Sequence, residues 1–391
     1  MSDAATGPTD APRYRVALLP GDGIGPEVTE AACSVVEAAG QRFGFEVTWQ
    51  RLVVGGAAID AHGVAMRPED LLRCEESDAV LLGAVGGPRW DDPRASVRPE
   101  QSLFMLRGGL GLYANLRPVR PLAALMDASP LRRELVADVD MLIVRELTGG
   151  IYFGERREAT GPPGKRKAVD TVPYGEHEIR RVVRLAFELA RGRRRLVTSV
   201  DKANVLATSR LWRMIATEEA EASVGIRLEH RLVDSCAMSL VTRPADFDVV
   251  VTENLFGDIL SDEASVLVGS LGMLPSASLG ERRTRYGTFG LYEPVHGSAP
   301  DIAGQDVANP LGAILSAAMM LRWSFGREDA ATAIERAVEA VLDAGYRTAD
   351  LTDVRRGHDL AETRLGTAGM VTRVIDAVTA STSGRALETV R

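Results

Sequence analysis

Apolar and polar residues follow two different periods along the chain. Five short apolar runs predict buried strands, at residues 14–20, 78–88, 141–147, 195–200 and 247–252. Longer amphipathic stretches predict helices, at residues 176–191, 203–218, 254–270, 310–325 and 329–345. Short strands that alternate with helices are typical of an α/β protein. Because ligands of open α/β sheets bind at the carboxyl ends of the strands, the polar residues that follow each predicted strand are the first candidates for chemistry.

The length of the chain indicates more than one compact unit. A chain of 391 residues exceeds what one hydrophobic core usually covers, which predicts two lobes. No Pro/Gly/Ser-rich linker separates two halves, so we expect the lobes to be interleaved along the sequence. Residues 1–12 contain neither a basic nor an apolar segment, so we interpret them as a flexible tail and not as a secretory signal.

Composition narrows the class of protein. No run approaches the roughly 18 apolar residues that span a bilayer, and the net charge of −8 argues against a general affinity for nucleic acid or anionic lipid. The three cysteines, Cys33, Cys74 and Cys236, match neither a disulfide framework nor a zinc spacing. We therefore expect a cytoplasmic protein with a small-molecule substrate, no nucleic-acid partner and no membrane partner.

Lysine is rare in this chain, because 43 of the 46 basic residues are arginine. Lys165 and Lys167 lie in GPPGKRKA, which we expect to be an exposed loop without chemistry. Lys202, in TSVDKANV, follows a predicted strand. A lysine can lose its proton when it is desolvated, whereas an arginine effectively cannot, so Lys202 is a candidate for proton transfer. Tyr152, in GGIYFG, is a second candidate, and a salt bridge from Lys202 to a neighbouring aspartate is the alternative to a chemical role.

Gly21, Gly23 and Gly25 follow the first predicted strand and precede a helix that Pro26 opens. A nucleotide-binding turn and a plain tight turn both remain open here, because the G-x-G-x-x-G spacing is missing. The chain also lacks the G-x-x-x-x-G-K-[ST] motif, which argues against a P-loop kinase or transferase.

Asp258 and Asp262, in NLFGDILSDEAS, are four residues apart and therefore lie on one face of the predicted helix. Two carboxylates that project together suit a hard divalent cation. A solvated acidic face is the alternative, but the pair directly follows an apolar strand, and Gly257 beside it permits a close approach.

Arg107, Arg117 and Arg145 stand at the ends of predicted elements. A guanidinium binds a carboxylate through two hydrogen bonds, so converging arginines suit a dicarboxylate substrate, although any single arginine of an arginine-rich chain is more often a surface residue. Residues 292–310 combine a histidine, an aspartate and an Asn-Pro helix start, and an acidic side chain that binds ribose hydroxyls is what an NAD site needs.

Taken together, these segments resemble the 3-isopropylmalate dehydrogenases, which belong to the decarboxylating β-hydroxyacid dehydrogenases. The resemblance rests on motifs that occur in order from residue 14 to beyond residue 320: GDGIGPEV, GGPRWD, RPEQSLFMLR, LYANLRPV, VRELTGGIYFGE, TSVDKANVL, TENLFGDILSDEAS and EPVHGSAPDIAG.

The resemblance implies a two-domain α/β fold with a central sheet flanked by helices, distinct from the Rossmann fold. It implies that residues 13–112 and 269–391 form an NAD-binding domain, and that residues 113–268 form a second domain with the dimer interface, the metal site and the catalytic residues. The active sites of the implied homodimer are shared between its subunits.

The resemblance also assigns roles to residues of this chain. Arg107, Arg117 and Arg145 would bind the substrate carboxylates. Asp258 and Asp262 would bind Mg²⁺ or Mn²⁺ together with Asp234 of the other subunit. Lys202, also from the other subunit, would relay the proton of the C2 hydroxyl, and Tyr152 would protonate the carbon that loses CO₂. The implied cofactor-binding residues are Asn204, Glu293, His296, Gly297, Ser298, Ala299, Pro300, Asp301, Ile302 and Asn309.

Which substrate the resemblance predicts depends on the segment before Arg107. Leu103 and Phe104 offer an apolar wall that fits an alkyl group, and Glu100 matches a position beside substrate and nicotinamide in isopropylmalate enzymes. Phe104 stands where leucine is common in these enzymes, which leaves open another 3-alkylmalate, homoisocitrate, D-malate or tartrate. A non-catalytic regulatory subunit of the same fold is the alternative from another class.

Overall fold

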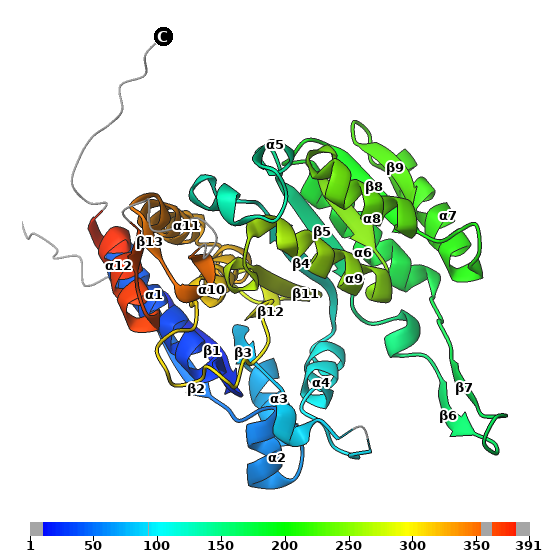
Figure 1. Cartoon of the computed structure of the whole chain (residues 1–391), viewed down its shortest axis with the longest axis horizontal. Helices are drawn as coiled ribbons and strands as arrows, with labels where there is room; N and C mark the ends of the chain where they lie inside the picture. The colour runs from blue at the N-terminus through cyan, green and yellow to red at the C-terminus, as the bar shows by residue number, and fades with distance from the viewer. Residues whose placement is uncertain (1–10, 93, 353–361, 381–391) are drawn as a thin grey trace, which may run out of the picture.

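A computed structural model describes residues 11–92, 94–352 and 362–380, and its main feature is a single sheet that runs through the whole molecule (Figure 1). Within these residues the sheet has ten strands in the order β2-β1-β3-β12-β11-β4-β5-β10-β8-β9. Their bounds are β1 Arg13–Gly21, β2 Glu46–Arg51, β3 Ala79–Ala84, β4 Leu112–Val119, β5 Met141–Glu146, β8 Leu196–Asp201, β9 Arg227–Leu232, β10 Val249–Thr252, β11 Pro275–Arg283 and β12 Thr288–Pro294.

Helices cover both halves of this sheet, which confirms the predicted α/β architecture (Figure 1). In one half α1 packs against α10 and α12, and in the other α6 packs against α7. The bounds of the helices are α1 Gly25–Phe43, α2 Gly56–His62, α3 Pro68–Glu75, α4 Gln101–Gly109, α5 Arg133–Val136, α6 Glu176–Ala190, α7 Ala207–Ala222, α8 Val233–Thr242, α9 Asn254–Ser265, α10 Leu311–Trp323, α11 Glu328–Asp343 and α12 Thr367–Ala380.

The middle of the sheet differs from its two ends. Strands β2, β1, β3 and β12 are parallel to one another, and so are β5, β10, β8 and β9. Between these groups β11 and β4 pair antiparallel with each other and with their outer neighbours. The two parallel groups therefore run in opposite directions, which distinguishes this sheet from the all-parallel Rossmann sheet.

The apolar runs located five of the buried strands correctly, but they missed β4, β11 and β12 in the middle of the sheet, because polar residues, glycine or proline interrupt the apolar runs of these three strands. The five predicted strands are β1, β3, β5, β8 and β10, and the five predicted helices are α6, α7, α9, α10 and α11. The edge strands β2 and β9 were not predicted, because their residues are mostly polar and partly exposed. Residues 1–10 of the predicted tail lie outside the described residues, and β1 begins at Arg13.

The first glycine cluster forms the turn between β1 and α1. Gly21 and Gly23 have φ of +75° and +58°, and a methyl group on either would lie 1.9 Å from a carbonyl oxygen, that of Ala84 or of Ser298. The amide of Ile24 donates to the Ser298 oxygen over 2.7 Å. This turn therefore supports the loop after β12, and its close packing requires glycine at both positions.

Two short strands, β6 (Arg156–Thr160) and β7 (Lys167–Asp170), form an arm that projects from the half that contains α6 and α7 (Figure 1). Every residue of both strands is exposed. Lys165 and Lys167 lie in this arm and are exposed, as predicted, although Lys167 begins strand β7 and does not belong to a loop. None of the helices within the described residues has the length and apolar character needed to cross a bilayer.

Candidate active site

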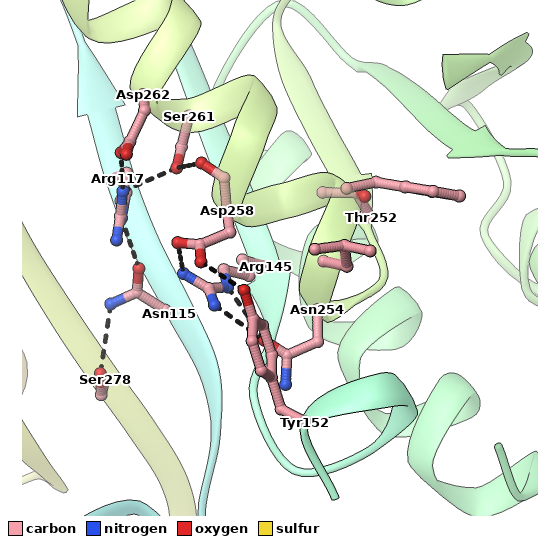
Figure 2. Close-up of polar contacts among 12 residues, drawn as sticks. Asn115, Arg117, Arg145, Tyr152, Thr252, Asn254, Asp258, Ser261, Asp262 and Ser278 are labelled. Atoms are coloured by element: carbon pink, nitrogen blue, oxygen red, sulfur yellow. Dashed lines mark hydrogen bonds and ion pairs between the residues drawn. The ribbon is translucent and has the colours of Figure 1, made fainter. Parts of the chain in front are cut away.

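Helix α9 carries the two aspartates across the face of the sheet. It begins after β10, where the Glu253 carboxylate accepts hydrogen bonds from the amides of Leu255 and Phe256, and it passes over β5 and β4. Asp258 and Asp262, one turn apart, face these two strands (Figure 2). The helical spacing therefore places both carboxylates on one side, as predicted.

Arg145, near the end of β5, lies under the first of these carboxylates. Its Nη1 forms an ion pair with Asp258 Oδ1, and its Nε and Nη2 both donate to Asn254 Oδ1, at 3.1 and 2.9 Å (Figure 2). Gly257 is required here, because a methyl group at that position would lie 2.6 Å from Arg145 Cγ. Burial lowers the pKa of Arg145 to about 10, against the opposing effect of Asp258, so the guanidinium is charged at neutral pH.

Arg117, on β4, meets the second carboxylate. Its Nη1 donates to Asp262 Oδ1 over 2.9 Å and to Ser261 Oγ over 2.7 Å. Its Nε donates to Asn115 Oδ1 over 2.9 Å, and the Asn115 amide in turn donates to Ser278 on β11 (Figure 2). This chain of contacts fixes the Arg117 guanidinium from both sides.

Tyr152 lies in a short 3-10 helix, η3 (Gly150–Tyr152), that follows β5. Its hydroxyl donates to Asp258 Oδ2 over 2.8 Å, and the Arg145 guanidinium lies 5.7 Å from the centre of its ring. Burial, and then the hydrogen bond to Asp258, raise the pKa of Tyr152, so the phenol keeps its proton at neutral pH. A protonated phenol beside a charged pair is a group that can donate a proton.

Helix α4 provides the opposite wall. Phe104 lies with its ring centre 6.5 Å from that of Tyr152 and 5.9 Å from that of Phe153. Glu100 immediately precedes α4, Leu103 lies on it, and Arg107 lies in its last turn. Arg107 Nη2 lies 3.5 Å from Glu293 Oε1 at the end of β12, and its buried Nε has no hydrogen-bond partner, so it remains available to a ligand.

Lys202 and Asp234 form a separate pair. The Lys202 ammonium donates to Asp234 Oδ1, and this contact is the main reason that the pKa of Asp234 lies below its ordinary value. The salt bridge considered as the alternative for Lys202 is thus present in the single chain. Within residues 11–92, 94–352 and 362–380, no three His, Cys, Asp or Glu residues are placed to hold one metal ion, so one chain does not bring Asp234 together with Asp258 and Asp262.

The loop after β12 contains most of the predicted cofactor residues. Gly297, Pro300 and Asp301 are exposed, whereas Ala299 and Ile302 are partly buried and Ser298 is buried, bound to the first glycine turn. His296 is partly buried, which lowers its pKa, and its Nε2 has no partner. Helix α10 begins directly after the Asn309-Pro310 pair, as predicted, and the Asn309 Oδ1 accepts the Leu311 amide over 3.0 Å. Asn204 is exposed in the turn between β8 and α7.

The sequence did not single out four polar residues of this network: Asn115, Asn254, Ser261 and Ser278. Each contacts an arginine of the site or holds a side chain that does. Asn115 and Asn254 lie within the motifs LYANLRPV and TENLFGDILSDEAS, but only the pairing of β4 with β5 and the passage of α9 over both reveal their roles.

A sequence model described as isocitrate/isopropylmalate dehydrogenase matches residues 15–374. The chain belongs to the isocitrate/isopropylmalate dehydrogenase family. Members of this family with high similarity include 3-isopropylmalate dehydrogenases of two bacteria. That of Anaeromyxobacter dehalogenans is 59% identical over 86% of this chain and 94% of its own length. That of Geobacillus kaustophilus is 60% identical over 86% of this chain and 90% of its own length.

Solved structures of the same family agree in fold. The isocitrate dehydrogenase of Methylococcus capsulatus superposes with a TM-score of 0.80 at 35% identity, over 94% of this chain and 99% of that one. The chain is thus a dehydrogenase of the isocitrate/isopropylmalate family. This excludes the alternative of a P-loop kinase or transferase.

Proposed function

We propose that this enzyme oxidises and decarboxylates 3-isopropylmalate to 4-methyl-2-oxopentanoate in leucine biosynthesis, with NAD⁺ and Mg²⁺ or Mn²⁺. The observation that carries the proposal is Asp258, whose two oxygens contact a carboxylate-binding arginine, Arg145, and a proton donor, Tyr152. Relatives that are 59% and 60% identical are 3-isopropylmalate dehydrogenases, which supports the choice of substrate.

The residues present fit a divalent cation. Asp258 and Asp262 offer hard oxygen ligands on one helical face, which suits Mg²⁺ or Mn²⁺. In the single chain these carboxylates are neutralised by Arg145 and Arg117 instead. Asp234, with a side chain 61% exposed beside Lys202, is free to contribute its carboxylate to a neighbouring subunit.

The residues also fit NAD. His296 Nε2 is a buried polar atom without a partner in the loop after β12, which also bears Asp301. An exposed acidic side chain such as Asp301 binds ribose hydroxyls and repels a 2′-phosphate, which favours NAD over NADP. Glu293, His296 and Asn309 would line the adenosine side of the cofactor, and Asn204 would lie near its nicotinamide.

Each step of the proposed reaction is assigned to particular side chains. When bound, NAD⁺ accepts the hydride from C2, and the cation acts as a Lewis acid toward the negative charge that develops. Arg107, Arg117 and Arg145 bind the carboxylates and orient the C2 hydrogen. Lys202 would accept the proton of the C2 hydroxyl as the neutral amine, after its ammonium proton has passed to solvent. Tyr152 donates its proton to the carbon that has lost CO₂, and each proton transfer contributes on the order of 10²–10⁴-fold to the rate.

The alkyl group of the substrate would contact Leu103 and Phe104, with Glu100 beside the nicotinamide. Phe104 is 38% exposed and in contact with Phe153 across the site, so its ring borders open space next to Tyr152. An apolar border of this kind favours an alkyl substituent over the third carboxylate of isocitrate.

We further propose a homodimer whose active sites are shared. Helices α8 and α9 expose large apolar side chains, among them Met238, Val241 and Ile259, which a soluble surface does not normally gather. The isolated β6–β7 arm is a two-stranded ribbon, and such a ribbon is marginally stable without further pairing. We assign residues 113–268, which contain both features, to the dimerising domain, and residues 13–112 and 269–391 to the NAD-binding domain, in a cytoplasmic enzyme.

A substrate panel tests the proposal. Purified enzyme with Mn²⁺ is assayed for reduced cofactor with NAD⁺ and with NADP⁺, on 3-isopropylmalate, longer 3-alkylmalates, homoisocitrate, D-malate and tartrate. We expect the highest kcat/KM for 3-isopropylmalate with NAD⁺. A higher kcat/KM for another acid would make that acid the substrate. If no acid led to reduction of the cofactor, the alternative of a non-catalytic regulatory subunit would be supported. The variant Phe104→Leu should change the ratio among alkylmalates by about 10–200-fold while D-malate changes little.

A further inference from the structure

Tyr174 lies behind the active site, just before α6, and its hydroxyl joins three segments. The oxygen lies 3.3 Å from Glu146 Oε2 and 3.3 Å from Glu253 Oε2, and it accepts a hydrogen bond from the Asn254 amide over 3.0 Å. Glu146 ends β5, and Glu253 and Asn254 begin α9. The hydroxyl therefore connects the strand that leads to Tyr152 with the helix that carries Asp258.

The two carboxylates extend this connection into the site. Glu146 is fully buried and accepts hydrogen bonds from the amides of Thr148 and Gly149, both over 2.8 Å, which holds the turn that leads into η3. Glu253 is 8% exposed and caps α9. Burial raises the pKa of both glutamates, and the phenolic hydrogen of Tyr174 is a donor that both can use.

The Tyr174 ring also lies directly against the turn. A methyl group on Gly149 would lie 2.5 Å from Tyr174 Cε1, and one on Gly150, where φ is +74°, would lie 2.7 Å from the Tyr174 oxygen. Glycine at these two positions thus lets the backbone approach the phenol closely. On the other side the side-chain amide of Asn254 donates to the Gly149 oxygen over 3.2 Å.

We propose that Tyr174 is a positioning residue, which sets the place of Tyr152 relative to Asp258 through the Glu146 turn and the Glu253 cap. The proposal rests on the proposed function, in which Tyr152 donates a proton after hydride transfer. Tyr152 and Asp258 belong to separate segments, so their 2.8 Å contact depends on a connection between those segments. A misplacement of about 1 Å in a reacting group can cost about 10²-fold in rate.

The first test needs no activity. Backbone amide hydrogen exchange is compared by mass spectrometry for wild type, Tyr174→Phe and the matched control Tyr292→Phe. Tyr292 is a buried phenol whose hydroxyl bonds Ser324 in the other half of the molecule. We expect faster exchange at residues 148–152 and 254–257 in Tyr174→Phe only. If residues 148–152 and 254–257 of Tyr174→Phe exchanged at the wild-type rate, the proposal would be wrong, whatever substrate the enzyme uses.

The second test separates positioning from a general loss of structure. With 3-isopropylmalate, NAD⁺ and Mn²⁺, we expect Tyr174→Phe to lower kcat about tenfold. KM should fall by a similar factor and the rate constant for the first turnover of NADH should stay unchanged, so that a burst of NADH appears. A burst amplitude and kcat that fall together would indicate fewer folded molecules and overturn the proposal, as would a raised KM.

Should Tyr174→Phe fail to fold, Glu253→Gln weakens the same connection and is judged on the same two readouts. Wild type without NADH formation would refute the proposed function, while the exchange experiment still decides the role of Tyr174.

Discussion

The hydroxyl of Tyr152 donates to Asp258 Oδ2 over 2.8 Å, although the two residues lie 106 positions apart in the chain. Asp258 uses its other oxygen for Arg145. One carboxylate thus holds the Tyr152 phenol and the Arg145 guanidinium, the proposed proton donor and the proposed substrate ligand, in fixed relation. Prearranged groups of this kind need little reorganisation during the reaction.

Tyr152→Phe removes the donated proton and leaves the ring in place. We expect kcat to fall by about 10²–10⁴-fold, because a positioned acid contributes that much. Hydride transfer precedes the proton donation in the proposed mechanism, so a first turnover of NADH should persist as a burst, and KM should fall together with kcat, which leaves kcat/KM nearly unchanged. Stopped-flow absorbance of NADH measures both. Loss of the burst together with kcat would place Tyr152 in the oxidation step instead.

The fold was predictable where a strand or helix has an uninterrupted apolar pattern. It was less so in the buried strands β4, β11 and β12, whose apolar runs contain polar residues, glycine or proline, and at the ends of elements. Helix α9 was predicted to reach residue 270 but ends at Ser265, because the chain tightens into a 3-10 turn at Val266–Val268 and Gly269 takes a φ of +88°. Helix α7 was predicted from residue 203 but begins at Ala207, because the Lys202 carbonyl accepts the amides of Val205 and Leu206 and closes a separate turn.

Lys202→Arg keeps the positive charge and the partner Asp234, but an arginine cannot accept the substrate proton. We expect NADH formation to fall by about 10²–10⁴-fold. Lys165→Arg is the matched control, because it makes the same replacement at an exposed position in the turn of the arm. Initial rates at saturating substrate measure the effect. Near-normal turnover in Lys202→Arg would remove this residue from the proton transfer.

The site was predictable residue by residue but not as an assembly. The four-residue spacing alone predicted that Asp258 and Asp262 lie on one face of a helix. Their partners depend on the sheet, because the antiparallel register sets Asn115 opposite Arg145 and leaves Arg117 two residues farther along β4, under the next turn of α9. No local pattern encodes that register. The pairing of Lys202 with Asp234 likewise spans 32 positions, from the end of β8 to α8.

Glu253→Gln should change the dependence of stability on pH. Burial raises the pKa of Glu253 in the folded chain, next to Glu146, Tyr174 and Arg145. A raised pKa means that the folded state holds the proton more tightly, so this contribution to stability is complete below the unfolded value of about 4.3 and is lost as pH rises through the folded value. The glutamine does not titrate.

The unfolding free energy of Glu253→Gln relative to wild type should therefore increase as pH rises above about 4, by about 1.4 kcal/mol for each unit by which the pKa is raised. Urea unfolding across this range measures it. Glu328→Gln is a control of opposite sign, because Arg322 lowers the pKa of Glu328, whose stabilising contribution grows as pH rises. A relative stability of Glu253→Gln that stays constant with pH would show that Glu253 titrates normally.

Complementation between inactive variants tests whether two chains build each site. In the proposed dimer, one subunit supplies Tyr152 and Asp258, and the other supplies Lys202 and Asp234. Lys202→Met and Tyr152→Phe are each nearly inactive as homodimers, but a heterodimer of the two contains one site with both native residues and one with neither. Dimers that are unfolded together and refolded at equal concentrations give roughly half heterodimers, so the mixture should recover roughly one quarter of wild-type activity.

A mixture of Lys202→Met with Asp234→Asn is the control. One subunit contributes both of these residues to the same site, so every site in this mixture lacks one of them. No recovery in the test pair would mean that each site is built within a single chain, and recovery in the control would mean that Lys202 and Asp234 contribute to different sites.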